Sequence, residues 1–453
     1  MPTAFRFVLA IGFVPTLAAF AATAAAQPSA LLVRGVTLID GNGGVPVDDT
    51  TVVIEGDRIA AVGGADLPIP DGAEVIDGRR RYLVPGLMDM HVHLRGGGSR
   101  RDGGAVTVEQ ERAGLRGLHS YLYAGVTSIY DAGNRSAFIF QLRRKERADE
   151  IVAPRIFATG GTVASPNGHG GPYLVEAWPE DRAVLDEHIA TGPDILKIGQ
   201  DEHGWMMRPL INQLPVDLLE RIIRHYHEQG IRSTIHVSTE RTAWEAIYAG
   251  VDTLAHPIIQ APVSDAYLEM MAVRRVPTVS TLTIGEAASR LVEHPEHLDE
   301  TLYRDTVESE EIARLKTEQR AREQENGRTG WLRTMTPIAQ ENLRRLHAAG
   351  KDIVVCGTDQ FSGPAVHREL ELLVEGGIPP ADAIVIATRN AARFLGRLDE
   401  MGTVESGKLA DLVILDADPT VDIDNLKRIV SVIKGGQIVD RSALDLPVNR
   451  GPL

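Results

Sequence analysis

Two histidines separated by one residue, His91 and His93, are the first residues whose types and spacing suggest chemistry. They follow the apolar stretch Pro85-Gly-Leu-Met-Asp-Met90. Alternate residues of a β-strand point to the same side, so both imidazoles face one way. Two neutral imidazoles on one side can bind one divalent metal ion. A single His-x-His pair is weak evidence on its own, because such pairs also occur by coincidence on protein surfaces.

Four more residues of metal-binding or catalytic type stand at or near the ends of other short apolar stretches. They are Lys197, His236, His256 and Asp359. A lysine flanked by Ile and Leu in a buried strand is unfavourable unless it is neutralised or paired. Any one of the four could be an ordinary hydrogen-bonded core residue. Six such residues in one register at strand ends indicate a shared site instead.

Short apolar stretches that alternate with helical segments must position these residues. There are eight of them, at 83–92, 127–130, 155–158, 195–198, 233–236, 253–256, 278–281 and 352–355. Strands that alternate with helices predict a parallel sheet, and eight repeats predict an α/β fold with a (β/α)8 TIM-like barrel. The six side chains would then meet at the C-terminal mouth of the barrel. The alternative is an open doubly wound sheet, although no glycine-rich nucleotide-binding motif follows an early strand.

The two ends of the chain have a different pattern from the middle. Residues 31–82 and 403–440 read as short strands with turns between them, and we expect them to pair into a small β-sandwich domain. Residues 83–402 would form the barrel. A highly charged helical insertion, 296–330, falls between the seventh and eighth strands. It is interpreted either as a solvated helix with charge pairs or as a lid over the site.

In combination, these motifs resemble the amidohydrolase superfamily and, within it, the imidazolonepropionase-like and prolidase-like branch. The supporting segments are Pro85-Gly-Leu-Met-Asp-Met-His-Val-His93, Ala249-Gly-Val-Asp-Thr-Leu-Ala-His256, Gly357-Thr-Asp359, Ala387-Thr-Arg-Asn-Ala-Ala392 and Gly402-Thr-Val-Glu-Ser-Gly-Lys-Leu-Ala-Asp-Leu-Val413. The resemblance covers nearly all of residues 31–440. It implies a distorted barrel and a β-sandwich made of both chain ends, in agreement with the pattern of strands.

The resemblance also implies a centre with two divalent metal ions, of which zinc is the default for a histidine-rich site. By this analogy His91, His93 and Asp359 hold one ion, and His236 and His256 hold the other. Lys197, carboxylated by CO₂, bridges the two. The activity implied is hydrolysis of an amide or peptide-like C–N bond by metal-activated hydroxide, with Asp359 carrying the proton to the leaving nitrogen.

Other residues near the predicted mouth have two interpretations each. His169, in Asn167-Gly-His-Gly-Gly-Pro172, resembles a loop that borders the substrate in relatives, or it is incidental to a glycine turn. His203 follows Lys197 in a predicted loop and is a weaker candidate for substrate binding. Asp131 orients a ligand histidine or caps a turn. The chain departs from many relatives at Val237-Ser238 and at Pro257, so the resemblance leaves the substrate open among dipeptides, N-acyl amino acids and cyclic amides.

The first 26 residues have the parts of a secretory signal peptide. They contain one basic residue, a mostly apolar run and the small residues Ala24-Ala-Ala26, and the alternative is a retained anchor. We therefore expect a secreted, periplasmic protein with no stable membrane insertion after cleavage. The net charge of −15 argues against a nucleic-acid partner. A small-molecule substrate and a homo-oligomer are expected. A lactone or phosphoester hydrolase and a catalytically silent periplasmic binding protein are the alternative functions.

Overall fold

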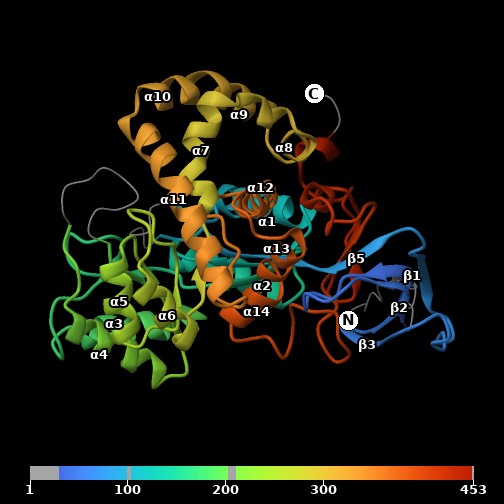
Figure 1. The fold of residues 1–453 in the computed structure, drawn as a ribbon, viewed down its shortest axis with the longest axis horizontal. Helices are drawn as coiled ribbons and strands as arrows, with labels where there is room; N and C mark the ends of the chain where they lie inside the picture. Colours follow the sequence, from blue (N-terminus) through green and yellow to red (C-terminus); the bar gives the residue numbers. More distant parts are fainter. Residues whose placement is uncertain (1–29, 99–103, 202–210, 451–453) are drawn as a thin grey trace, which may run out of the picture.

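The computed structural model describes residues 30–98, 104–201 and 211–450. The signal peptide predicted over 1–26 and His203 lie outside these residues. The predicted α/β fold class is confirmed. A β domain built from both chain ends lies on one side of the molecule, and the helices that surround the parallel strands occupy the other (Figure 1). No helix of the described part of the chain is both long and apolar enough to cross a membrane.

The β domain is one hydrogen-bonded sheet of eight strands in the order β18-β17-β16-β5-β1-β2-β3, with β4 paired to β1. Its strands are β1 Leu31–Leu38, β2 Val47–Glu55, β3 Arg58–Gly63, β4 Glu74–Asp77, β5 Tyr82–Pro85, β16 Leu412–Leu415, β17 Ile429–Lys434 and β18 Gln437–Ile438. The two chain ends meet where β5 pairs antiparallel with β16. Alternate side chains such as Val33, Ile54 and Leu412 face one apolar core.

The barrel strands lie within or overlap the eight predicted stretches. They are β6 Leu87–Val92, β7 Val126–Asp131, β8 Arg155–Ala158, β11 Ile195–Gly199, β12 Arg232–His236, β13 Thr253–Leu254, β14 Thr278–Val279 and β15 Val354–Val355. Two short strands, β9 Thr162–Ala164 and β10 Pro172–Leu174, follow β8. The helices that connect them are α1 Val108–Tyr123, α2 Ser136–Arg147, α3 Arg182–Ala190, α4 Val216–His227, α5 Glu240–Tyr248 and α6 Asp265–Arg274. All strand pairs within this part are parallel, as the alternation of strands and helices requires.

Backbone hydrogen bonds cross both gaps between the two parallel sheets. On one side the amide of Asp194 donates to the carbonyl of Ala158, at 2.9 Å. On the other side the amide of Met90 donates to the carbonyl of Cys356, at 3.0 Å, and Val92 forms an isolated parallel bridge with Gln360. The first strand is therefore joined to the last, which is the arrangement of a barrel.

One predicted element is divided in the structure. The strand expected over 83–92 is two strands, since β5 ends at Pro85 and belongs to the β domain, whereas β6 begins at Leu87. Gly86 lies between them and packs against Thr127, whose Oγ1 would stand 2.1 Å from a Cβ at this position. The sequence does not reveal this break, because both strands are buried and the segment is therefore apolar throughout.

The charged segment between β14 and β15 forms an arm of helices that projects from the barrel (Figure 1). After α7 Leu282–Glu293 come a short 3₁₀ helix Pro295–Asp299, α8 Thr301–Thr306, α9 Ser309–Arg314, a π-helical turn Leu315–Gln319, α10 Arg320–Glu325 and the long α11 Gly327–Ala349. After β15 come α12 Pro364–Glu375, α13 Pro380–Ile386 and α14 Arg389–Phe394, and 3₁₀ helices cover Ile423–Lys427 and Pro447–Asn449. The arm meets the barrel mouth through an ion pair, in which Oε1 of Glu311 lies 3.7 Å from Nη1 of Arg95.

Candidate metal centre

The ends of the parallel strands bring the six sequence-predicted residues together. His91 lies at the end of β6 and His93 directly after it. Lys197 lies in β11, and His236 is the last residue of β12. His256 and Asp359 follow β13 and β15. Together they form one cluster at the C-terminal mouth of the barrel, the position at which barrel enzymes place their active sites.

Backbone carbonyls fix the orientation of the first two histidines. Nδ1 of His91 lies 2.9 Å from the carbonyl oxygen of Ala255, and Nδ1 of His93 lies 2.8 Å from that of Gly133. A carbonyl can only accept a hydrogen bond, so both Nδ1 atoms carry the proton. Both Nε2 atoms therefore bear a lone pair, and they lie 3.8 Å and 3.2 Å from Oδ1 of Asp359.

Close packing and backbone strain place Asp359. Its amide donates to the carbonyl of His91 at 2.7 Å, and its φ of 53° is left-handed, a conformation that aspartate adopts more readily than most residues. A Cβ at Gly357 would lie 2.9 Å from the amide nitrogen of His91, so glycine permits this approach. Burial raises the pKa of Asp359, but His91, His93 and Lys197 outweigh burial and hold this pKa well below its usual range.

A buried carboxyl group joins the two strand ends beneath this pair. Asp89 accepts hydrogen bonds from the amides of His91 and Thr358, and from the Thr358 hydroxyl at 2.7 Å. Burial raises the pKa of Asp89 to about 7. Asp89 thus holds His91 and the residue before Asp359 in a fixed relation. Its position in the sequence, two residues before His91 on the same strand, is the only signal that could have indicated it.

Lys197 is buried, with 4% of its surface exposed, and its Nζ lies 3.4 Å from Nε2 of His91. Its backbone amide donates to Oγ1 of Thr159 at 3.1 Å, which fixes the strand at this point. A cation at this depth, beside imidazoles that could themselves bind cations, is unfavourable.

His236 and His256 complete the cluster with rings whose centroids lie 4.2 Å apart. The ring of His256 is also 4.5 Å from that of His91. Burial lowers the pKa of all three of these imidazoles below the usual value for histidine. Neutral imidazoles are the form that binds a metal ion.

His169 reaches the cluster from the loop after β9. Its ring lies 4.1 Å from that of His236, which agrees with its predicted place at the mouth. The loop passes directly over Gly199, where a Cβ would stand 1.6 Å from the carbonyl oxygen of His169. Gly199 is thus required for this loop to approach the end of β11.

The sequence did not single out Asp201, which is fully buried beside His236. Oδ2 of Asp201 lies 3.2 Å from Nε2 of His236, and Oδ1 accepts a hydrogen bond from the Ser238 hydroxyl at 2.7 Å. Asp131 accepts hydrogen bonds from the amides of Gly133 and Leu94, and the carbonyl of Gly133 in turn contacts Nδ1 of His93.

The donor atoms form two groups that could hold metal ions. In the first group, His91, His256 and Asp359 each offer one atom, and these atoms lie within 4.8 Å of one another. In the second group, His169, Asp201 and His236 do the same. Buried neutral imidazoles with carboxylates are suitable ligands for zinc and similar divalent ions. The residues present therefore fit a two-ion centre, but both groups differ from the predicted sets. The first contains His256 in place of His93, and the second joins His236 to His169 and Asp201.

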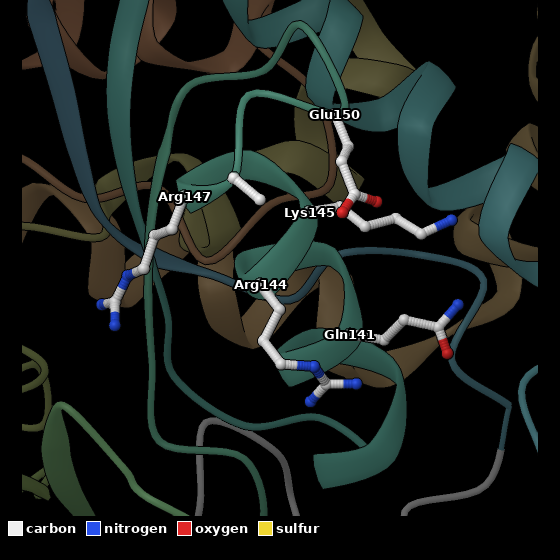
Figure 2. Close-up of a pocket in the computed structure, with 6 residues that line it drawn as sticks. Gln141, Arg144, Lys145, Arg147 and Glu150 are labelled. Carbon is white, nitrogen blue, oxygen red and sulfur yellow. The ribbon is translucent and has the colours of Figure 1, made fainter.

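A surface hollow of about 540 Å³ lies elsewhere, on α2 (Figure 2). It is lined by Gln141, Arg144, Lys145, Arg147, Ala148 and Glu150. Helix α2 runs antiparallel to the strands, so its C-terminal end lies at the bottom of the barrel, away from the mouth. None of the clustered residues lines this hollow, and we assign the active site to the cluster.

Comparison with known families matches residues 82–439 to the model of the amidohydrolase family. Among characterised proteins, the chain is similar to the imidazolonepropionase of Rhizorhabdus wittichii, with 28% identity over 422 residues that cover 84% of this chain and 92% of that protein. It is also similar to the adenine deaminase of Mesorhizobium japonicum, with 24% identity over 437 residues. That match covers 93% of this chain but only 60% of the deaminase.

Solved structures show the same fold over almost the whole chain. A Xaa-Pro dipeptidase with methionine bound in its active site superposes with a TM-score of 0.71, at 24% identity, over 91% of this chain and all of that chain. Molinate hydrolase gives a TM-score of 0.72, at 23% identity, over 94% of this chain and 97% of that one.

Proposed function

The chain belongs to the amidohydrolase family, and from this premise we propose that it is an exported, metal-dependent hydrolase that cleaves an amide or peptide-like C–N bond of a small molecule. One observation carries the proposal. Side chains from five separate strand ends, including His91, Lys197 and Asp359, converge within hydrogen-bonding or ligand distance at one mouth. A site assembled from so many segments is the usual construction of a barrel enzyme.

We propose that His91, His93 and Asp359 would hold one metal ion and that His236 and His256 would hold the other. Lys197, if carboxylated by CO₂, would serve as a ligand to both. Asp201 and His169 lie close enough to His236 to contribute to the second position. Bound divalent ions would lower the pKa of water and polarise the scissile carbonyl group.

Asp359 is the residue that moves the proton. Its carboxylate accepts a proton from the attacking water and delivers it to the nitrogen that leaves, while the new C–O bond forms and the C–N bond breaks. The low pKa of Asp359 keeps this carboxylate ionised at neutral pH, which is the form that a proton acceptor needs. His169, at the rim beside His236, is placed to donate a hydrogen bond to the substrate carbonyl or carboxylate.

The names of similar proteins suggest a substrate class. The similar proteins include an imidazolonepropionase and a Xaa-Pro dipeptidase, whose names refer to a cyclic amide derivative and to dipeptides. We therefore propose dipeptides, N-acyl amino acids or cyclic amides as substrates. The features of residues 1–26 support secretion to a periplasmic space, and we propose a homo-oligomer acting on a soluble small molecule.

The test is metal analysis followed by a hydrolysis screen of the purified protein. We expect about two divalent ions per chain, as the two ligand groups require. Removal of the ions with a chelator should abolish hydrolysis, and adding back Zn²⁺, Mn²⁺ or Co²⁺ should restore it. The screen contains dipeptides, N-acyl amino acids and cyclic amides, with lactones and phosphoesters alongside them. Turnover of lactones or phosphoesters alone would contradict the C–N assignment, and a metal-free protein would contradict the whole proposal.

A further inference from the structure

We propose that Glu369, on α12, is a positioning residue for the metal centre, because it holds the turn in which the Thr281 hydroxyl contacts His256. This inference rests on the proposed function, since that function makes His256 a metal ligand. Glu369 is fully buried, and it lies outside the two ligand groups described above.

Thr281 has an unusual backbone at the point where β14 passes into α7. Its φ is 35° and its ψ is 39°, which is left-handed. A β-branched residue adopts this conformation rarely, and it persists only where the surroundings impose it. The Thr281 amide still donates to the carbonyl of Gly357 at 2.9 Å, so the chain turns sharply only after the sheet ends.

The side chain of Thr281 does not perform the usual function of a threonine at a helix start. Thr107 and Thr239, at the starts of α1 and α5, have extended backbones and accept a hydrogen bond from an amide of the first turn. Thr281 makes no such bond to α7. Its Oγ1 instead lies 2.9 Å from Nδ1 of His256. The left-handed turn directs this hydroxyl away from the helix and toward the site.

Glu369 performs the capping that Thr281 does not. One of its carboxylate oxygens accepts from the Leu282 amide at 2.9 Å, and the other accepts from the Thr283 amide at 2.8 Å and from the Thr283 hydroxyl. These are the first two residues of α7, and a negative charge is favourable at a helix N-terminus. A carboxylate from a distant helix thus accepts hydrogen bonds from two amides of the first turn and stabilises the strained turn.

The consequence for His256 is a defined orientation of its ring. A hydroxyl can donate or accept a hydrogen bond. Where the Thr281 hydroxyl accepts one from Nδ1–H of His256, the Nε2 lone pair is available to a metal ion. Carbonyls provide this function for His91 and His93. For His256 the partner is a side chain, and that side chain is correctly placed only while Glu369 holds the turn.

The experiment compares Glu369→Gln and Thr281→Val with a matched control, Glu286→Gln. Glu286 is on α7 and pairs with Arg368 of α12 at 2.5 Å, so the control removes the same charge between the same two helices without touching the turn. The measured quantities are Zn²⁺ affinity, by competition with a chromophoric chelator, and the tautomer of His256 in the metal-free protein, by ¹⁵N NMR. Thr281→Ser is the conservative variant that keeps the hydroxyl.

We expect Glu369→Gln and Thr281→Val each to weaken the binding of one Zn²⁺ ion by 10- to 100-fold, as loss of an outer hydrogen-bond partner does at other metal sites. Thr281→Ser and Glu286→Gln should stay within about twofold of the unmodified protein. If Glu369 acts through Thr281, the double variant Glu369→Gln/Thr281→Val should bind Zn²⁺ no more weakly than the single variant with the lower affinity. The inference would be overturned if the fold-losses of Zn²⁺ affinity in the two single variants multiplied in the double variant, or if Glu286→Gln lost as much affinity as Glu369→Gln.

The tautomer measurement separates this inference from the proposed function. We expect His256 to carry its proton on Nδ1 in the unmodified, metal-free protein and to become a mixture of tautomers in Glu369→Gln and Thr281→Val. If the unmodified protein bound no Zn²⁺ but showed this change, the metal assignment would fail and the positioning role would stand. If Glu369→Gln did not fold, Thr281→Val would decide: unchanged affinity together with an unchanged tautomer would refute the role.

Discussion

Replacement of Asp359 by Asn tests the proton-transfer step most directly. The two side chains have the same shape, and both tolerate the left-handed backbone that Asp359 adopts at φ 53°. The amide of residue 359 would still donate to the carbonyl of His91. The substitution therefore removes the carboxylate charge and its basicity while it leaves the position of the side chain unchanged.

The expected loss follows from what the carboxylate does. A positioned general base typically contributes 10²- to 10⁴-fold to the rate, which corresponds to about 3–5 kcal/mol of activation free energy. Asp359 Oδ1 lies 3.2 Å from His93 Nε2 and 3.8 Å from His91 Nε2, so an amide oxygen at the same place can still serve as a weaker ligand. We therefore expect kcat to fall by at least 10²-fold while most of the metal stays bound.

The assay combines steady-state hydrolysis of the best substrate from the screen with metal analysis of the same preparation. Asp416→Asn is the matched control, because Asp416 bonds to Arg428 in the β domain at 3.2 Å and should leave kcat unchanged. Turnover of Asp359→Asn within a few-fold of the unmodified enzyme would show that the proton moves by another route. Complete loss of metal would show that the residue acts mainly as a ligand.

Three further predictions concern other parts of the structure. Lys197→Ala is expected to lose metal as well as activity, and an active variant with its full metal content by elemental analysis would remove the lysine from the site. Gly199→Ala is expected to lower kcat/KM and to reduce the free energy of unfolding by about 1–3 kcal/mol, because the new Cβ would meet the His169 carbonyl. Steady-state kinetics and urea unfolding measure these two quantities, and unchanged values would refute the packing of the His169 loop on Gly199. Burial lowers the pKa of His188 from 6.5 to about 4, so the unfolded state binds more protons between these pH values and folding loses stability as the pH falls through this window. Between pH 7 and pH 4, the free energy of unfolding of His188→Asn should therefore fall by up to about 3 kcal/mol less than that of the unmodified protein, as measured by urea unfolding. A difference between the two proteins that is the same at every pH would contradict the assignment.

The sequence predicted the eight barrel strands, but not the short strands β9 and β10. Five of these strands are short apolar stretches with a residue of metal-binding type in or just after them, as at His236 and His256. Parallel strands in a barrel end at one mouth, so the position of a residue along its strand also fixes its position in space. The break at Gly86 was not predicted, because the strands on either side of it are both buried and apolar.

The loops beyond the strand ends were much less predictable. Next to Lys197 the sequence interpretation chose His203, which lies outside the described residues, and it did not choose Asp201, which contacts His236. Loop residues are usually exposed, and nothing in Gln200-Asp201 signals that the aspartate is fully buried. Burial of such a residue depends on how β11 and β12 lie side by side, and this information is absent from the local sequence.

The orientation of the ligand rings could not be predicted from the types of the residues around them. Nδ1 of His91 and of His93 contacts a backbone carbonyl, which every residue has, so the identities of Ala255 and Gly133 reveal nothing. His256 depends on a threonine hydroxyl that is held by a glutamate of a distant helix. Parallel strands therefore bring the ligands into proximity, and acceptors outside the motifs determine which nitrogen faces the centre. It follows that relatives can keep every ligand and still differ in metal affinity through changes at these acceptor positions.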